Sequence, residues 1–294
     1  RYIGDVSNAN SDATMVSTQR SLIYGQLNKN LYQKFFMTTE ELQATEDGYI
    51  YIHDMKDRLD TMNCCLFDIG NVLRDGFEMG NIWYNEPKTL DVAFDVISDV
   101  VISAAAQQYG GFTIPRVETI LAPYAEKSYY NYLNEYGDIV GSSTYMEEKA
   151  IDYALSKVRR DMEQGFQSWE YRFNTVGSSR GDYPFVSISF GIGQSQFETM
   201  ASEVALEVRK NGQGKKGFKK PVLFPKLTFL YDENLHGVGK PLEWLFEKAI
   251  DCSCQTMYPD YLSLTAKKNL KKLSSHFTKF SFLSRGENRS LELK

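Results

Sequence analysis

Apolar residues recur along the chain at two spacings, one typical of helices and one typical of strands. Apolar positions three or four residues apart predict helices over residues 14–34, 39–44, 89–107, 117–135, 146–173, 195–210 and 241–255. Alternating or continuous apolar runs predict strands over residues 48–53, 185–190 and 221–230, and a short buried run over residues 62–67. Strands separated by long helices indicate an α/β fold built in layers.

Cap and break residues mark the ends of several predicted elements. Thr39 is a suitable N-cap for the second helix, and Gly110-Gly111 is a suitable stop for the third. Pro225 allows an edge, a bulge or a strand end in the last strand. Composition does not change abruptly within residues 1–262, so we predict that this part forms one domain.

Charge is distributed unevenly along the 294 residues, although the net charge of −5 is small. Residues 266–294 carry eight basic and two acidic side chains, a net charge of +6, which leaves −11 for the remainder (25 basic, 36 acidic). A basic tail on an acidic body is typical of a nucleic-acid arm or a membrane-surface segment. A basic tail of this kind could also be sequence that does not belong to the fold. The chain begins at Arg1 without Met, so we treat it as a fragment at both ends.

Composition excludes several classes of protein. No run of eighteen apolar residues could span a membrane, and Arg1–Asn10 does not resemble a signal peptide. Four cysteines in so long a chain do not form a disulfide scaffold, which favours reduced thiols and a cytoplasmic location. The negative net charge argues against binding to duplex DNA.

The cysteines give the first candidate chemistry. Cys64 and Cys65 are adjacent in an apolar, strand-like run, so they point to opposite faces and only one can face a given cavity. Buried cysteines are most often small core residues, which leaves radical or redox chemistry open, while nothing supports Cys-His hydrolysis. Cys252 and Cys254 lie on different faces of a predicted helix and are interpreted as structural, because no zinc pattern completes them.

Two loops have the composition of anion-binding segments. Small hydroxyls, glycines and an arginine offer N–H donors and a fixed charge between residues 174 and 184, and a Gly/Lys loop follows at 210–217. An ordinary turn-rich or surface loop remains the alternative for each, and the second lacks the P-loop pattern. The candidate binding residues are Asn174, Ser178, Ser179, Arg180, Gly181, Lys210, Gly212 and Gly214.

The three histidines carry weaker signals. His53 is followed by Asp54, a pair that could act as a general acid or a metal ligand but is more often a structural hydrogen bond. His236 and His276 lie in polar sequence without a supporting partner. We therefore predict no metal site from these residues.

Nine short motifs, taken together and in order over residues 7–263, resemble the anaerobic (class III) ribonucleoside-triphosphate reductases, which are glycyl-radical enzymes. The motifs are Ser7–Asn10, Gly48–Asp54, Asn63–Leu66, Glu86–Thr89, Tyr109–Pro115, Leu121–Tyr124, Asn174-Thr175 with Gly181 and Pro184-Phe185, Phe224–Leu227 and Met257–Asp260. The resemblance implies a ten-stranded α/β barrel made of two five-stranded halves, of which this chain would form the first half with its long helices.

The resemblance also implies the chemistry of the family, which reduces ribonucleoside triphosphates to 2′-deoxy forms. Cys64 would be the catalytic cysteine of the first barrel strand, facing the interior, with Cys65 packing outward. Formate would be the reductant, ATP and deoxynucleotides the effectors, and a radical S-adenosylmethionine activase the partner that installs the glycyl radical. A homodimer through long helices is expected, with residues 89–107 as a candidate interface. The loop over 177–183 would lie near substrate or effector, and the loop over 210–217 would relay between them.

The sequence departs from the family after Ser263. The radical-cysteine segment, the glycyl-radical segment, the cysteine-rich zinc module and the ATP-binding regulatory domain are not recognisable. We therefore expect the chain alone to be inactive and residues 264–294 to be a basic, non-family tail, frameshifted or disordered. A degenerate, non-catalytic nucleotide-binding protein and a related glycyl-radical lyase are the alternatives.

Overall fold

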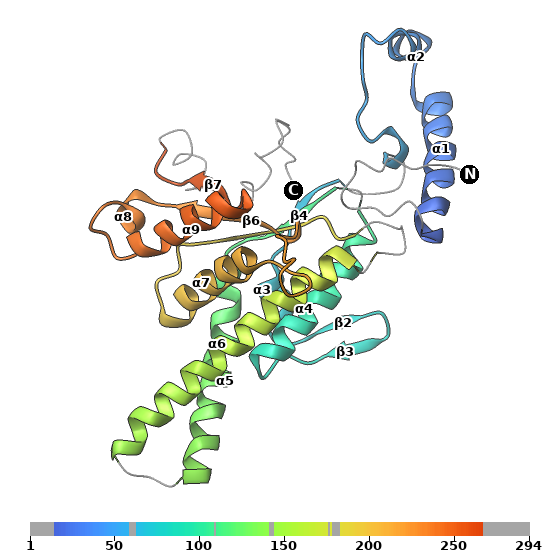
Figure 1. The fold of residues 1–294 in the computed structure, drawn as a ribbon. Helices are drawn as coiled ribbons and strands as arrows, with labels where there is room; N and C mark the ends of the chain where they lie inside the picture. Colours follow the sequence, from blue (N-terminus) through green and yellow to red (C-terminus); the bar gives the residue numbers. More distant parts are fainter. Residues whose placement is uncertain are drawn as a thin grey trace.

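A five-stranded, all-parallel sheet forms the centre of the protein (Figure 1). The structure is a computed structural model, and it describes residues 15–58, 63–108, 110–140, 144–175, 177 and 183–266. The strands lie side by side in chain order: β1 (Cys65–Leu66), β4 (Phe112–Ile114), β5 (Val186–Phe190), β6 (Lys226–Tyr231) and β7 (Asp260–Ser263). A separate antiparallel hairpin pairs β2 (Phe77–Met79) with β3 (Ile82–Tyr84).

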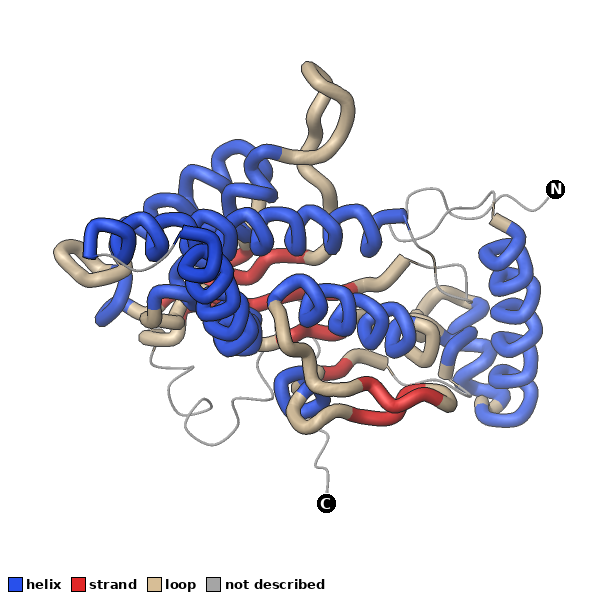
Figure 2. Tube along the Cα trace, turned by 90° about the horizontal axis from the view of Figure 1, so that it is seen from below, coloured by secondary structure: helices blue, strands red, loops and turns tan. Residues whose placement is uncertain are grey.

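Helices make every connection between neighbouring strands of the sheet. They are α3 (Ile69–Leu73) and α4 (Leu90–Ala105) before β4, α5 (Val117–Val140) and α6 (Thr144–Thr175) before β5, α7 (Gln196–Asn211) before β6, and α8 (Glu233–His236) and α9 (Glu243–Thr256) before β7. Parallel crossovers are right-handed, so strands added in one direction receive their helices on one face. Figure 2 shows the helices in front of the strands, as this rule requires. The predicted α/β class and its half-barrel form are therefore confirmed.

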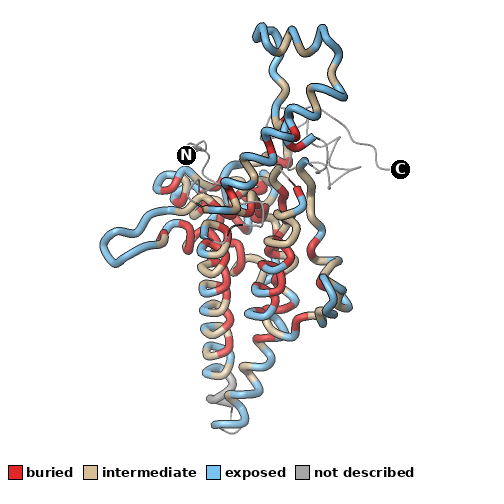
Figure 3. Tube along the Cα trace, turned by 90° about the vertical axis from the view of Figure 1, so that its right-hand side faces the viewer, coloured by how far each residue is buried: buried red, intermediate tan, exposed pale blue. Residues whose placement is uncertain are grey.

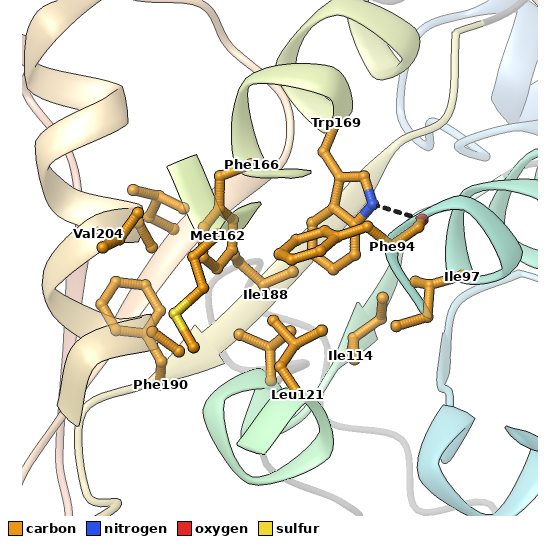
Figure 4. Close-up of a cluster of buried hydrophobic side chains, with 14 of the residues drawn as sticks. Phe94, Ile97, Ile114, Leu121, Met162, Phe166, Trp169, Ile188, Phe190 and Val204 are labelled. Carbon is orange, nitrogen blue, oxygen red and sulfur yellow. Dashed lines mark hydrogen bonds between the residues drawn. The ribbon is translucent and has the colours of Figure 1, made fainter. Parts of the chain in front are cut away.

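The core lies between this helical layer and the sheet (Figure 4). Trp169 of α6 is fully buried, and its indole Nε1 donates a hydrogen bond to the Phe94 carbonyl of α4 at 3.0 Å. Gly165 lies at the same helix crossing, where an added Cβ would approach the Phe94 ring within 3.0 Å. The close approach of α4 to α6 therefore depends on a residue without a side chain.

The apolar stripe of α4 is part of this core. Ala93, Phe94, Ile97 and Val101 are at most 2% exposed, because they pack against α6 and the sheet. The family resemblance makes residues 89–107 a candidate dimer interface. The structure supports packing on the barrel for this stripe, so it is not available for a partner subunit.

Two N-terminal helices extend away from the body (Figures 1 and 3). They are α1 (Val16–Phe36) and α2 (Thr39–Glu46), followed by the short 3₁₀ helix η1 (Met55–Asp57). The helical spacing predicted α1 correctly, but Ile23, Leu27 and Phe35 are more than half exposed. Thr38, not Thr39, caps α2, and it forms a capping box with Glu41.

Several predictions from local sequence were wrong. Residues 48–53 alternate like a strand but pair with no other strand in the described part of the chain, and Tyr49 and Tyr51 are more than 80% exposed. An alternating sequence forms a β-strand only when a neighbouring strand is present to hydrogen-bond with it. The glycines at 110–111 do not stop α4, which already ends at Ala105. The short strands β4 and β7 and the β2–β3 hairpin were not predicted.

Candidate functional site

The face of the sheet opposite the helices is lined with polar side chains. In β5, Val186, Ile188 and Phe190 point to the core, so Ser187 and Ser189 point to the other face. Register extends this polar face across the neighbouring strands, because Ser187 pairs with Thr113 of β4 and with Lys226 of β6, and Ser189 pairs with Thr228. By the same register Leu66, Leu230 and Leu262 also lie on this face, and Thr113 and Ser189 are buried. A ligand there would therefore meet Ser187, Lys226 and Thr228 beside apolar side chains.

Strand β1 places its two cysteines differently. Cys65 pairs with the buried Phe112 and packs against the core, where its Sγ donates to Gln108 Oε1 at 3.4 Å. Burial, and next the neighbouring thiol of Cys64, raise the pKa of Cys65. Leu66 pairs with Thr113, so the alternation assigns Cys64, two residues earlier, to the polar face.

A tight turn before β4 packs directly against Cys64. The Cys64 thiol donates a hydrogen bond to Asn63 Oδ1 at 3.1 Å. An added Cβ at Gly110 would lie within 3.0 Å of both Cys64 Sγ and Asn63 Oδ1, and one at Gly111 would meet the Phe185 ring. Glycine is therefore required at both positions by the close approach of neighbouring side chains.

Asn174 has a structural role that its sequence did not reveal. Its amide Nδ2 donates to the Glu170 and Phe224 carbonyls, each at 2.7 Å, and its Oδ1 accepts from Phe224 N at 3.1 Å. The side chain thus ties the end of α6 to the segment before β6. The other candidates of this loop, Ser178, Ser179, Arg180 and Gly181, lie outside the described residues.

The second predicted loop forms a hairpin between α7 and β6. Lys210 forms an ion pair with Asp251 of α9. Gly212 ends α7 with a φ of 64°, and Gly214 has a φ of 135°, both in the region that favours glycine. Backbone hydrogen bonds between Gln213 and Lys220 close the hairpin. The backbone conformation accounts for the glycines at positions 212 and 214, and the ion pair accounts for Lys210. Neither requires a bound ligand.

A buried ionic network lies beneath the same segment and was not predicted. Arg209 of α7 is 1% exposed and donates to Glu170 Oε1 at 2.7 Å and to the Pro225 carbonyl at 2.6 Å. Gln213 donates to the second oxygen of Glu170 at 2.6 Å. Since Pro225 directly precedes β6, this network fixes the start of the strand that carries Lys226.

Two buried titratable groups hold the loop that follows β5. Glu118 accepts hydrogen bonds at Oε1 from the backbone nitrogens of Gly191 (3.2 Å) and Gly193 (3.3 Å). Burial is the main cause that raises the pKa of Glu118 to about 7. Its Oε2 is buried without a hydrogen-bond partner. The carboxylate is therefore better suited to its site when protonated.

His236 holds the other side of the same loop, contrary to the prediction that it lacks a partner. It is 2% exposed, its Nδ1 accepts from Asp232 N at 3.0 Å, and its Nε2 lies 2.8 Å from the Gly191 carbonyl. This arrangement assigns a neutral ring with the proton on Nε2. Burial lowers the pKa of His236.

The remaining candidates are structural or exposed. His53 Nδ1 contacts the Asp54 carboxylate, with the His53 side chain 63% exposed. Cys252 is buried and Cys254 is exposed, on different faces of α9 as expected. Within the described ranges, no group of three or more His, Cys, Asp and Glu residues could hold a metal ion, and no helix is long and apolar enough to cross a membrane.

Comparison with known proteins gives one consistent family. The sequence profile of the family described as anaerobic ribonucleoside-triphosphate reductase matches residues 7–282, which extends past the predicted boundary at residue 263. The enzyme of that name from Enterobacteria phage T4 is 34% identical over 266 residues, which cover 89% of this chain and 42% of the relative. The corresponding Escherichia coli (strain K12) enzyme is 33% identical over 259 residues, covering 87% and 35%.

Solved structures agree on the fold. The anaerobic ribonucleotide reductase from Thermotoga maritima with citrate in the active site superposes with a TM-score of 0.56 at 16% identity, covering 84% of this chain and 45% of that one. The same enzyme in complex with dATP and CTP gives a TM-score of 0.55 at 15% identity, covering 84% and 41%. The chain therefore spans less than half the length of each of these proteins.

Proposed function

Because the chain belongs to the anaerobic ribonucleoside-triphosphate reductase family, we propose that it is the part of such an enzyme that binds the ribonucleotide on the polar face of its sheet. The observation that carries this proposal is the position of Cys64. By strand alternation its side chain points to the polar face, and its thiol packs against Gly110. Cys65 packs against the core on the other face. A thiol held on a strand is aimed more precisely than one on a loop.

In this function, Cys64 reacts as a neutral thiol during reduction of the 2′-position, with formate as the reductant. In the whole enzyme, the glycyl radical installed by the radical S-adenosylmethionine activase supplies hydrogen abstraction. Thr113, Ser187 and Lys226 line the face on which the sugar and phosphates would lie.

Effectors and partners follow from the same proposal. ATP and deoxynucleotides would act as effectors, with the loop over 210–217 transmitting their binding. Asn174 would act indirectly, because its side chain is occupied by Phe224. A cytoplasmic homodimer through the long helices would use outward-facing residues such as Tyr130 of α5 and Ile151 of α6, which are exposed.

Isothermal titration with a ribonucleoside triphosphate tests the binding part of this proposal. A charged hydrogen bond to phosphate contributes about 1.5–3 kcal/mol, so Arg180→Ala is expected to weaken binding by about ten- to a hundredfold. Arg160→Ala is the matched control, because Arg160 is exposed and pairs with Asp161 on α6. Unchanged affinity of Arg180→Ala would remove this arginine from the site.

We expect the isolated chain to form no deoxynucleotide, even after treatment with activase, S-adenosylmethionine and formate. Nucleotide-dependent thermal stabilisation without turnover would support a binding role for the chain. Detectable deoxynucleotide would show that it contains the complete catalytic machinery.

A further inference from the structure

The partly buried Cys64 thiol contacts the side chain of Asn63 and the turn at Gly110. Its Sγ donates to Asn63 Oδ1 at 3.1 Å. The same two atoms, Sγ and Oδ1, both lie within 3.0 Å of the point that a Gly110 Cβ would occupy. The thiol and the amide oxygen therefore occupy the space that a side chain at position 110 would need.

Gln108 holds that turn in place. It is 6% exposed, and its Oε1 accepts from Cys65 Sγ at 3.4 Å while its Nε2 donates to the Gly110 carbonyl at 3.4 Å. The backbone of β1 is joined to the same turn, since Cys65 N donates to the Gly111 carbonyl at 3.3 Å. The turn at Gly110 and Gly111, which contacts Cys64, is thus held in place by hydrogen bonds that involve Cys65.

The hydrogen bond to Asn63 favours one protonation state of Cys64. In the observed orientation the carboxamide oxygen accepts a hydrogen bond from S–H, whereas a thiolate would require the amide to turn and present its N–H donors. A hydrogen bond made by the neutral form disfavours ionisation. Among the described residues, the thiol of Cys65 interacts electrostatically with that of Cys64. Lys226 Nζ lies over the Phe185 ring, which packs on Gly111 at the other side of the turn.

We propose that Asn63 is a positioning residue that keeps Cys64 as a neutral thiol, with its S–H bond directed by the amide oxygen against the wall formed by Gly110. The proposal rests on the proposed function, in which Cys64 reacts as a thiol. A neutral thiol retains the hydrogen that reduction requires, and it is protected from alkylation and oxidation, which proceed through the thiolate.

Alkylation of Cys64 by iodoacetamide, followed by peptide mass spectrometry over a range of pH, tests this role. Asn63→Ala removes the acceptor, so the apparent pKa of Cys64 is expected to fall. The alkylation rate of Cys64 at neutral pH should then rise about three- to tenfold, which corresponds to the free energy of one hydrogen bond. Asn63→Asp keeps an acceptor and adds a negative charge, so the pKa should rise and the rate should fall below that of the wild type.

Cys254, exposed on α9, is the internal control in every sample, and urea-unfolded protein corrects for changes in local sequence. Alkylation of Cys64 that is fastest in Asn63→Ala, slower in the wild type and slowest in Asn63→Asp supports the proposal. Loosened packing would instead accelerate alkylation in both variants. Equal rates, or an aspartate variant faster than the wild type, would overturn it. The assay contains no nucleotide, so this result is independent of whether the chain binds one.

Discussion

Arg209→Ala is expected to lower the free energy of unfolding by about 3–5 kcal/mol, the largest loss expected from one substitution in this chain. Arg209 and Glu170 are 1% and 4% exposed and are joined at 2.7 Å. Removal of the arginine leaves the Glu170 carboxylate buried with a hydrogen bond from Gln213 but without its charged partner. The Pro225 carbonyl also loses a donor, so the start of β6 should loosen. Urea unfolding followed by circular dichroism measures the change.

The double variant Glu170→Gln/Arg209→Met separates buried charge from packing. It removes both charges and keeps similar volumes, so it should be more stable than Arg209→Ala. Arg159→Met is the matched control, because Arg159 also joins α6 to α7 through Glu203 and Glu207 but is 32% exposed. A loss below about 1 kcal/mol is expected there. Equal losses in Arg209→Ala and Arg159→Met would contradict the importance of burial.

Glu118→Gln is expected to stabilise the protein increasingly as pH rises. The pKa of Glu118 is about 7 in the folded chain against 4.5 for an ordinary glutamate. Between these values the folded state binds more protons than the unfolded state, so the stability that Glu118 contributes falls with rising pH. Glutamine does not titrate, and it therefore removes this fall, worth up to about 3 kcal/mol above pH 7. Urea unfolding at several pH values measures the difference between the two proteins.

Glu198→Gln provides a control of opposite sign. Burial opposes ionisation of Glu198, but hydrogen bonds from Ser195, Thr119 and Gln194 outweigh it and lower its pKa. Its contribution to stability is present above the ordinary pKa and is lost as pH falls, so the glutamine variant should lose stability at neutral pH. His236, whose pKa is lowered, also destabilises the wild type on acidification below 6.5, so only the difference from wild type isolates Glu118. A difference that does not change between pH 4.5 and 8 would refute the assignment.

The sequence predicted the helices well because their periodicity extends over many residues. α4 and α7 differ from the prediction by at most two residues at either end. Strand β4 was missed because three residues show no periodicity, and residues 48–53 were misassigned because alternation does not reveal whether a neighbouring strand exists. Local pattern therefore identified long elements and failed where pairing decides the structure.

The candidate site was likewise predicted only where local pattern decides the structure. The rule that adjacent strand residues face opposite ways separated Cys64 from Cys65, and in the structure the partly buried Cys65 packs against the core. Asn174 was selected for its polarity, but its partner Phe224 lies fifty residues away. The pairing of Arg209 with Glu170 and the partners of His236 are likewise formed between distant segments. No local signal in the sequence reports such contacts.

The most direct test of the proposed site is whether a ribonucleoside triphosphate protects Cys64 from alkylation. With CTP as the probe, we expect the rate of iodoacetamide labelling to fall at Cys64 as nucleotide is added and to stay constant at the exposed Cys254. Protection should be weaker in Arg180→Ala at the same concentration. Identical Cys64 labelling rates with and without nucleotide would contradict the placement of the ribonucleotide on this face of the sheet.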